Sequence, residues 1–141
     1  MQKLVDQLAD FSIRLSAFGM ADMENQHWGC FMYQLMIVED EELIRKNLGQ
    51  IIDFEALGFS VAGICENGSK ALDLFDSKEI HAVITDICMP VMDGLALSEQ
   101  IYQRKPQTKI VILTGYDDFN YARQAVKYKV WEYLVKPVTA D

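Results

Sequence analysis

The sequence lacks several features that would place it at once in a class of protein. Basic residues are few, since 13 lysines and arginines stand against 21 aspartates and glutamates, for a net charge of −8. This acidic excess argues against nucleic-acid binding by this segment. No apolar run approaches the roughly 20 residues of a membrane-spanning helix, and Asp6 and Asp10 interrupt any signal peptide. We therefore expect a cytoplasmic protein without a membrane partner.

Cysteine and histidine are also scarce. The three cysteines, Cys30, Cys65 and Cys88, are widely spaced and contain no CxxC pair, and only two histidines accompany them. A zinc site needs closer ligand spacing than this. We expect free thiols, buried or partly buried, in a reducing compartment.

What remains has an ordinary globular composition, with 50% hydrophobic and 24% charged residues in a chain of 141, the length of one domain. The pattern changes near residue 32. Apolar residues at helical spacing predict an amphipathic helix at about residues 2–18, followed by an irregular connector. We expect residues 1–31 to be an N-terminal extension and residues 32–141 to be the main domain.

From residue 33 onward, short β-branched and apolar segments alternate with helical patterns. These segments predict buried strands at 34–38, 59–64, 82–85, 110–114 and 133–135. Strand–helix alternation builds right-handed βαβ units, so we expect an α/β fold with a doubly wound, five-stranded parallel sheet. No helical pattern follows the fifth strand, so the last helix of such a sheet is expected to be missing, while the N-terminal helix is extra.

Chemically active side chains stand at the ends of these strands. Glu39 and Asp40 follow the first strand, Asp86 the third and Lys136 the fifth, and Thr114 ends the fourth. Ligands of a doubly wound sheet bind outside the carboxyl ends of its strands, so these groups are expected to converge. Capping of the following helices is the competing interpretation for any single carboxylate.

Such a set has a defined chemistry. Carboxylates held close together repel one another, and Mg²⁺, which takes oxygen ligands, relieves that repulsion. The metal and an ammonium group form a positive frame for a phosphoryl group, in which a carboxylate can act as nucleophile and become an acyl phosphate.

Four segments resemble, in order, the signature segments of response-regulator receiver domains of two-component systems: IVEDEELIRKNL (37–48), ITDICMPVMDG (84–94), LTGYDDFNYARQAV (113–126) and EYLVKPV (132–138). The resemblance covers residues 32–138 and implies the flavodoxin-like receiver topology, with strand order 2-1-3-4-5. Two stretches, IIDFEALGF (51–59) and GYDDFNYARQAV (115–126), further resemble receivers of the YesN type, whose regulators carry an AraC-type helix-turn-helix output domain.

The resemblance implies a phosphorylation site and a metal site. Asp86 matches the aspartate that a histidine kinase phosphorylates. Glu39 and Asp40 match the acidic pair that positions Mg²⁺, and the backbone carbonyl of Cys88 matches a further metal ligand. Many members have aspartate in place of Glu39, so we expect this longer side chain to act through water.

The resemblance also implies a switch. Thr114 matches the hydroxyl that moves toward the phosphoryl group, Tyr133 the aromatic side chain that turns inward on activation, and Lys136 the phosphate-binding lysine. In this family the surface of the fourth helix and fifth strand then changes, which leads to homodimerisation and output. The expected partners are a sensor histidine kinase, a second copy of the chain, and DNA through an output domain outside this chain. Such a domain marks and unmarks itself and is not an enzyme that turns over an external substrate.

Three alternative functions stay open. A Mg²⁺-dependent phosphatase with an aspartyl nucleophile usually has a second aspartate two residues later, where Cys88 stands here. A flavin-binding module needs a phosphate-cradling loop after the first strand, where the sequence has EDEE (39–42). A phosphorylation-independent interaction module is the third. Of the remaining polar residues, Asp93 is a candidate N-cap, and His81 is expected to lie at the surface or to be hydrogen-bonded rather than to act in a phosphorelay.

Overall fold

The structure is a computed structural model that describes residues 33–51, 53–56, 58–114, 123, 130 and 132–135. Several predictions fall outside these residues: the N-terminal helix at about 2–18, the helix between the fourth and fifth predicted strands, the absence of a last helix, and the position of Lys136. Cys30 also lies outside them.

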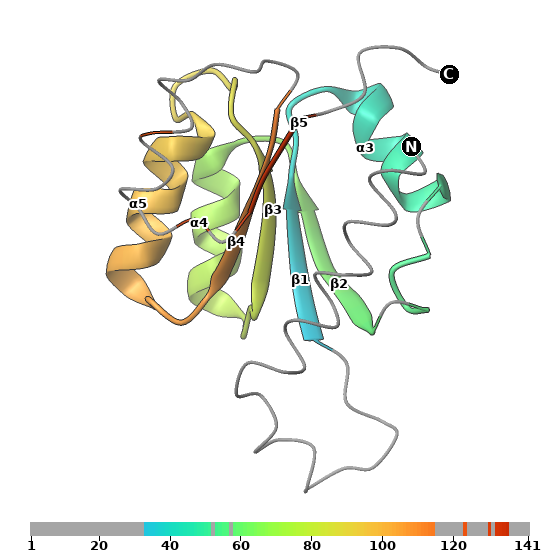
Figure 1. Ribbon diagram of the computed structural model, residues 1–141, viewed down its shortest axis with the longest axis horizontal. Helices are drawn as coiled ribbons and strands as arrows, with labels where there is room; N and C mark the ends of the chain where they lie inside the picture. Colours follow the sequence, from blue (N-terminus) through green and yellow to red (C-terminus); the bar gives the residue numbers. More distant parts are fainter. Residues whose placement is uncertain are drawn as a thin grey trace, which may run out of the picture.

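A parallel β-sheet forms the centre of the fold (Figure 1). Its strands are β1 (Tyr33–Val38), β2 (Phe59–Cys65), β3 (Ala82–Asp86), β4 (Lys109–Thr114) and β5 (Glu132–Val135). They are arranged in the order β2-β1-β3-β4-β5, and each neighbouring pair is parallel. The prediction of a doubly wound, flavodoxin-like parallel sheet is thus confirmed.

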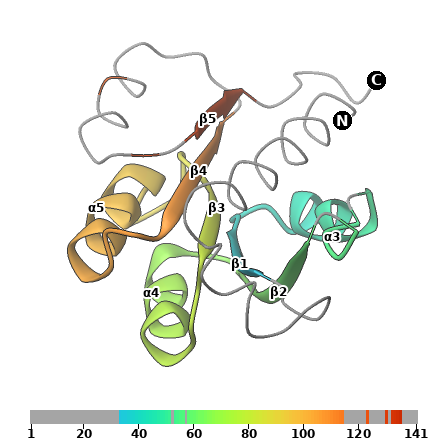
Figure 2. The same cartoon turned by 60° about the horizontal axis from the view of Figure 1, so that its bottom comes forward.

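Helices cover both faces of this sheet. The described helices are α3 (Glu42–Ile51), α4 (Gly68–Ser77) and α5 (Gly94–Arg104). α4 and α5 lie side by side on one face, and α3 lies on the other, as the two views in Figures 1 and 2 agree. The chain therefore crosses from one face to the other between α3 and α4, so the loops after β1 and β3 meet at the carboxyl edge of the sheet.

The hydrophobic core under α4 and α5 is formed by strand side chains that alternate between the two faces of the sheet and by the apolar side of each helix. Strand residues that point to this face, such as Met36, Val83 and Ile112, are buried against the apolar side of the helices. Phe75 of α4 and Ile101 of α5 are the large helical contributions, each at most 1% exposed. The burial of strand residues on both faces explains why the strands read as unbroken apolar runs.

Both helices on this face begin with a side-chain cap followed by glycine. Asn67 Oδ1 accepts a hydrogen bond of 2.9 Å from the amide of Lys70, and Asp93 Oδ1 accepts one of 2.8 Å from the amide of Ala96. These bonds satisfy amides that the first helical turn leaves without a partner. The interpretation of Asp93 as an N-cap is confirmed.

His81 closes the opposite, amino-terminal edge of the sheet. It is buried, its Nδ1 accepts a hydrogen bond of 2.8 Å from the amide of Gln34, and its own amide donates to the carbonyl of Gln34. Its carbonyl accepts from the amide of Lys109, so it ties the starts of β1 and β4 together. His81 is thus a hydrogen-bonded structural histidine. Of the two expectations for it, a surface position or a hydrogen-bonded one, the second is confirmed.

The prediction of buried or partly buried thiols is confirmed for Cys65 and wrong for Cys88. Cys65, the last residue of β2, is buried, whereas Cys88, between the buried Ile87 and Met89 in the loop after β3, is exposed. Among the residues that the structure describes, no helix is long and apolar enough to cross a membrane.

Candidate functional site

The register of β1 and β3 brings two acidic residues together. Val38, the last residue of β1, pairs with Thr85 of β3, so Glu39, directly after β1, and Asp86, the last residue of β3, reach the carboxyl edge at the same level. Val38 points into the core under α4 and α5. Because side chains alternate along a strand, Glu39 and Asp86 project to the other side, where α3 lies.

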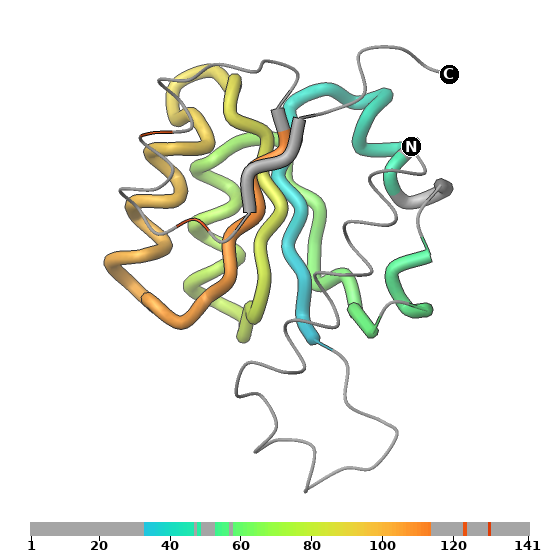
Figure 3. Tube along the Cα trace, viewed as in Figure 1, coloured from blue at the N-terminus to red at the C-terminus, as the bar shows by residue number. Residues whose placement is uncertain are grey.

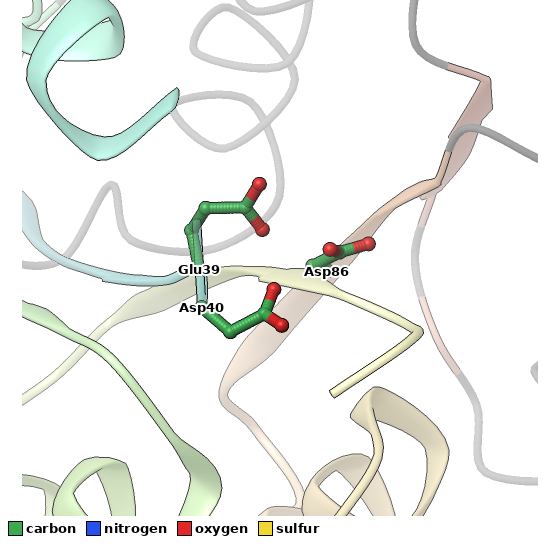
Figure 4. Close-up of side chains that lie close together, drawn as sticks. All are labelled: Glu39, Asp40 and Asp86. Atoms are coloured by element: carbon green, nitrogen blue, oxygen red, sulfur yellow. The ribbon is translucent and has the colours of Figure 1, made fainter. Parts of the chain in front are cut away.

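Asp40 completes an acidic cluster, defined by Glu39, Asp40 and Asp86. One carboxylate oxygen from each residue lies within 4.8 Å of the other two. Figure 4 shows Glu39 and Asp40 at the end of β1 and Asp86 at the end of β3, with the carboxylates of the first two reaching toward the third. Glu39 is 2% exposed and Asp86 8%, whereas Asp40 is more exposed, so two of the three residues are shielded from solvent.

Three carboxylates held this close together repel one another, and a bound cation would relieve that repulsion. At the limiting separation of 4.8 Å and an effective dielectric constant of about 20, two ionised carboxylates would repel by roughly 3 kcal/mol. Oδ1 of Asp40 is buried and has no hydrogen-bond partner within the described part of the chain. Buried polar atoms are normally satisfied, so this oxygen is a candidate metal ligand. Carboxylate oxygens are the donors that Mg²⁺ prefers, and the residues present fit that ion.

The backbone around Asp86 holds its carboxylate in one orientation. The amide of Ile87 donates a hydrogen bond of 2.8 Å to Oδ1 of Asp86, and the hydroxyl of Thr85 donates one of 2.9 Å to its carbonyl oxygen. The amide of Gly94 bonds the carbonyl of Ile87 at 2.9 Å, which fastens the start of α5 to the same loop. A carboxylate held this way needs little reorganisation before it binds a ligand or reacts.

The loop between β3 and α5 contains an unusual conformation. Val91 has φ of 69°, in the left-handed region that β-branched residues avoid, and its side chain is fully exposed. Cys88, whose carbonyl is a predicted metal ligand, lies in the same loop two residues after Asp86.

The other predicted site residues are placed only by their backbone, or not at all. Thr114 is the last residue of β4 and pairs with Val135, one residue beyond the Asp86–Leu113 pair of β3 and β4. Tyr133 pairs with Ile112 on the same two outer strands. Lys136 lies outside the described residues. Figure 3 traces β3 and β4 along the sheet toward this edge.

Sequence reasoning missed Arg45. This residue of α3 donates a hydrogen bond of 2.8 Å from Nη1 to the carbonyl oxygen of Glu39. Its only signal in the sequence is a basic residue shortly after an acidic pair, which is equally typical of a solvated helix surface. The hydroxyl of Thr85 was missed for the same reason, since a threonine within a buried strand has no distinctive pattern.

Comparisons with known proteins agree with this arrangement. The sequence profile of the response regulator receiver domain matches residues 35–141. The chain is 40% identical over 106 residues to the uncharacterized transcriptional regulatory protein YesN of Bacillus subtilis, an alignment that covers 75% of this chain and 29% of YesN. It is 36% identical over 107 residues to the transcriptional regulatory protein HptR of Staphylococcus aureus, covering 76% of this chain and 42% of HptR.

Solved structures show the same fold. The REC domain of AraT, a response regulator from Geobacillus stearothermophilus, superposes with a TM-score of 0.69 at 33% identity, covering 75% of this chain and 82% of that one. The response regulator TrrA from Thermotoga maritima, in complex with Mg²⁺-BeF, superposes with a TM-score of 0.66 at 32% identity, covering 78% and 91%. The chain spans less than half the length of the curated relatives described above.

Proposed function

This chain belongs to the response regulator receiver domain family, and we propose that its Asp86 accepts a phosphoryl group from a sensor histidine kinase. The observation that carries the proposal is the acidic cluster, in which Asp86 lies within 4.8 Å of two other carboxylates at the carboxyl edge of the sheet. Receiver domains are signalling domains, so the product of the reaction is the modified domain itself.

In the proposed step, an oxygen of Asp86 forms a bond to phosphorus as the bond between phosphorus and the donor nitrogen of the kinase histidine breaks. The imidazole then takes up a proton. The amide of Ile87 already donates to Oδ1 of Asp86. This bond keeps the carboxylate plane fixed while the new bond to phosphorus forms.

Glu39, Asp40, Asp86 and the carbonyl of Cys88 are the proposed ligands of Mg²⁺. The bound ion supplies positive charge that offsets the charge on the phosphoryl oxygens. The fit rests on the all-oxygen donor set and on the buried Oδ1 of Asp40. The related TrrA was solved in complex with Mg²⁺-BeF.

Thr114, Tyr133 and Lys136 are proposed to read the phosphorylated state. The strand register supports the first assignment, because Thr114 ends β4 beside the strand that ends in Asp86. Phosphorylation adds negative charge and acceptor oxygens, which the Thr114 hydroxyl and the Lys136 ammonium are suited to bind. Movement of Thr114 then permits Tyr133, on the adjacent strand, to change position and alter the outer surface of the sheet.

The proposed partners follow from the exposed residues around the cluster and from the relatives. Leu43, in the first turn of α3, is 73% exposed, and Val91 is fully exposed in the loop after β3. We propose that these two exposed apolar side chains, which follow Asp40 and Asp86 closely in the sequence, contribute contact area for a kinase. Because YesN and HptR are transcriptional regulatory proteins and are much longer, we infer that this receiver controls transcription through a C-terminal helix-turn-helix domain. Activation as a homodimer and action in the cytoplasm belong to the same proposal.

The division of the chain is also proposed. Residues 32–141 are the receiver, and residues 1–31 are an extension whose amphipathic helix covers apolar surface on the receiver or on a second copy. Removal of residues 1–31 is expected to lower the urea midpoint or the solubility of the remaining domain. A shortened chain as stable and as soluble as the whole would contradict this role.

The phosphorylation proposal is tested with acetyl phosphate as the donor. We expect the chain to gain one phosphoryl group in the presence of Mg²⁺, to lose this reaction in Asp86→Asn, and to keep it in Asp93→Asn. The control removes a carboxylate of the same loop that only caps α5. Protein mass measured over time gives the rate, and an Asp86→Asn protein modified as fast as the wild type would overturn the assignment. Steady release of phosphate from a generic phosphoester would instead identify a phosphatase.

A further inference from the structure

The backbone of Glu39 is held from both sides. Its amide donates a hydrogen bond of 3.0 Å to the carbonyl of Cys65 at the end of β2, and its carbonyl accepts the bond of 2.8 Å from Arg45. The carbonyl belongs to the peptide unit that joins Glu39 to Asp40. Its orientation therefore sets the direction in which both side chains leave the backbone.

The backbone of Arg45, whose side chain bonds this carbonyl, is held in place by helix α3. Its own amide bonds the carbonyl of Glu41 at 3.0 Å, so it lies in the first turns of α3, and it is half-buried. Its charge also reaches the end of β2. The pKa of Glu66 is lowered chiefly by its hydrogen bond and ion pair with Lys70, and to a smaller extent by Arg45. The guanidinium thus lies at the end of β1, bonded to the backbone of the acidic cluster.

We propose that Arg45 is a positioning residue for the magnesium site: its hydrogen bond to the carbonyl of Glu39 holds Glu39 and Asp40 toward Asp86 before the metal binds. This inference rests on the proposed function. Residues 39–41 belong to neither strand nor helix, and mutual repulsion of the three carboxylates acts to spread them apart. The guanidinium opposes that movement through the backbone, without neutralising a carboxylate that the metal needs.

The alternative is that Arg45 acts only as a nearby positive charge, and the two roles predict opposite results. A positive charge near a cation site weakens cation binding, so its removal would tighten the binding of Mg²⁺. Loss of a positioning bond would weaken it instead, and partners of metal ligands typically contribute about 10- to 100-fold in affinity. Arg45→Lys keeps the positive charge but loses the planar guanidinium group. It therefore distinguishes the positioning role from the charge role a second time.

The test measures Mg²⁺ binding to the full chain by calorimetry. We expect Arg45→Met to bind Mg²⁺ about tenfold more weakly than the wild type, and Arg45→Lys to bind with an intermediate affinity. The matched control is Arg104→Met. Arg104 also donates from Nη1 to a backbone carbonyl, that of Gln100 at 3.3 Å, and bonds Asp76, but it joins α5 to α4 away from the cluster. We expect that control to keep the wild-type affinity.

Two further readouts distinguish positioning from a general loss of structure. Without metal, amide hydrogen exchange at Asp40 and Glu41 is expected to be faster in Arg45→Met and unchanged in Arg104→Met. With acetyl phosphate, the Mg²⁺ concentration for half-maximal phosphorylation is expected to rise in Arg45→Met, while the rate at saturating Mg²⁺ stays the same. If Arg45→Met does not fold, Arg45→Lys decides the question in the same assays.

Unchanged or tighter Mg²⁺ binding by both Arg45 variants overturns the positioning role and leaves the proposed function standing. A wild-type chain that binds no Mg²⁺ overturns both.

Discussion

Gly94, the first residue of α5, packs directly against the carbonyl group of Asp86. A β-carbon at position 94 would overlap that carbonyl oxygen and would lie 2.9 Å from Cα of Ile87. The helix thus starts against the backbone of the proposed phosphoacceptor, and only a glycine permits so close an approach.

This contact predicts a large cost for Gly94→Ala. Because the obstacle is backbone on both sides, α5 or the end of β3 must shift, and we expect a loss of about 1–3 kcal/mol in the free energy of unfolding. Gly68→Ala is the matched control, since Gly68 also begins a capped helix. A β-carbon there meets only the side chain of Met92, which is flexible. Urea denaturation compares the two, and equal losses would contradict the explanation.

Val91 is expected to be a source of strain that substitution can relieve. Its φ of 69° disfavours a β-branched side chain, while its full exposure means that little packing is lost on replacement. Asparagine tolerates this region, so we expect Val91→Asn to stabilise the protein by about 1 kcal/mol. Val91→Thr keeps the β-branch and should leave the urea midpoint near that of the wild type. A destabilised Val91→Asn would show that the valine side chain makes a contribution of its own.

His81 is expected to stabilise the sheet through one ring nitrogen. Its replacement by alanine removes the acceptor of the Gln34 amide, and leaving that group without a partner should cost about 1–3 kcal/mol. Asparagine can offer an oxygen close to the position of Nδ1. We therefore expect His81→Asn to keep more stability than His81→Ala in thermal or urea unfolding. Phosphorylation by acetyl phosphate should proceed in both, because His81 lies at the edge of the sheet opposite to Asp86.

Cys65 and Cys88 are expected to differ sharply in reactivity. Burial raises the pKa of the Cys65 thiol, an effect that Lys70 only partly offsets, whereas Cys88 is exposed. Thiolate is the reactive form, so iodoacetamide should modify Cys88 first. Peptide mass spectrometry after timed labelling measures each site. Labelling in concentrated urea should bring the two rates together, and a persistent difference there would point away from burial as the cause.

Lys70 is expected to control the ionisation of Glu66. The hydrogen bond and charge of Lys70 hold the pKa of Glu66 below its ordinary 4.5. A lowered carboxyl pKa means that the pair stabilises the fold at neutral pH, and that this contribution is lost as the pH falls through the pKa of the folded state. Lys70→Met should move the pKa upward in an NMR titration. Lys46→Met, which removes a similar pair with Glu42, should leave the pKa of Glu66 unchanged.

Much of the architecture was predictable because it depends on local patterns. The unbroken apolar runs of β1, β3 and β4 predicted strands buried on both faces, and each predicted strand end lies within one residue of the observed one. Asp93 was recognisable as a cap because capping is a contact within four residues. The grouping of Glu39, Asp40 and Asp86 also followed from sequence, since parallel strands present their carboxyl ends at one edge.

Other features depend on how distant elements meet, and residue type alone carries no information about that. Arg45 is one of several basic residues on helices, and only the position of α3 over the end of β1 brings it to the carbonyl of Glu39. Cys65 and Cys88 are the same residue type with opposite environments. The contact of Gly94 with Asp86 arises from packing of α5 on the sheet. Sequence alone thus identified the strands, because apolar runs mark them, and the acidic residues, because they follow directly after those runs or end them. Tertiary structure decided the strand register and the backbone contacts that hold the acidic residues in place.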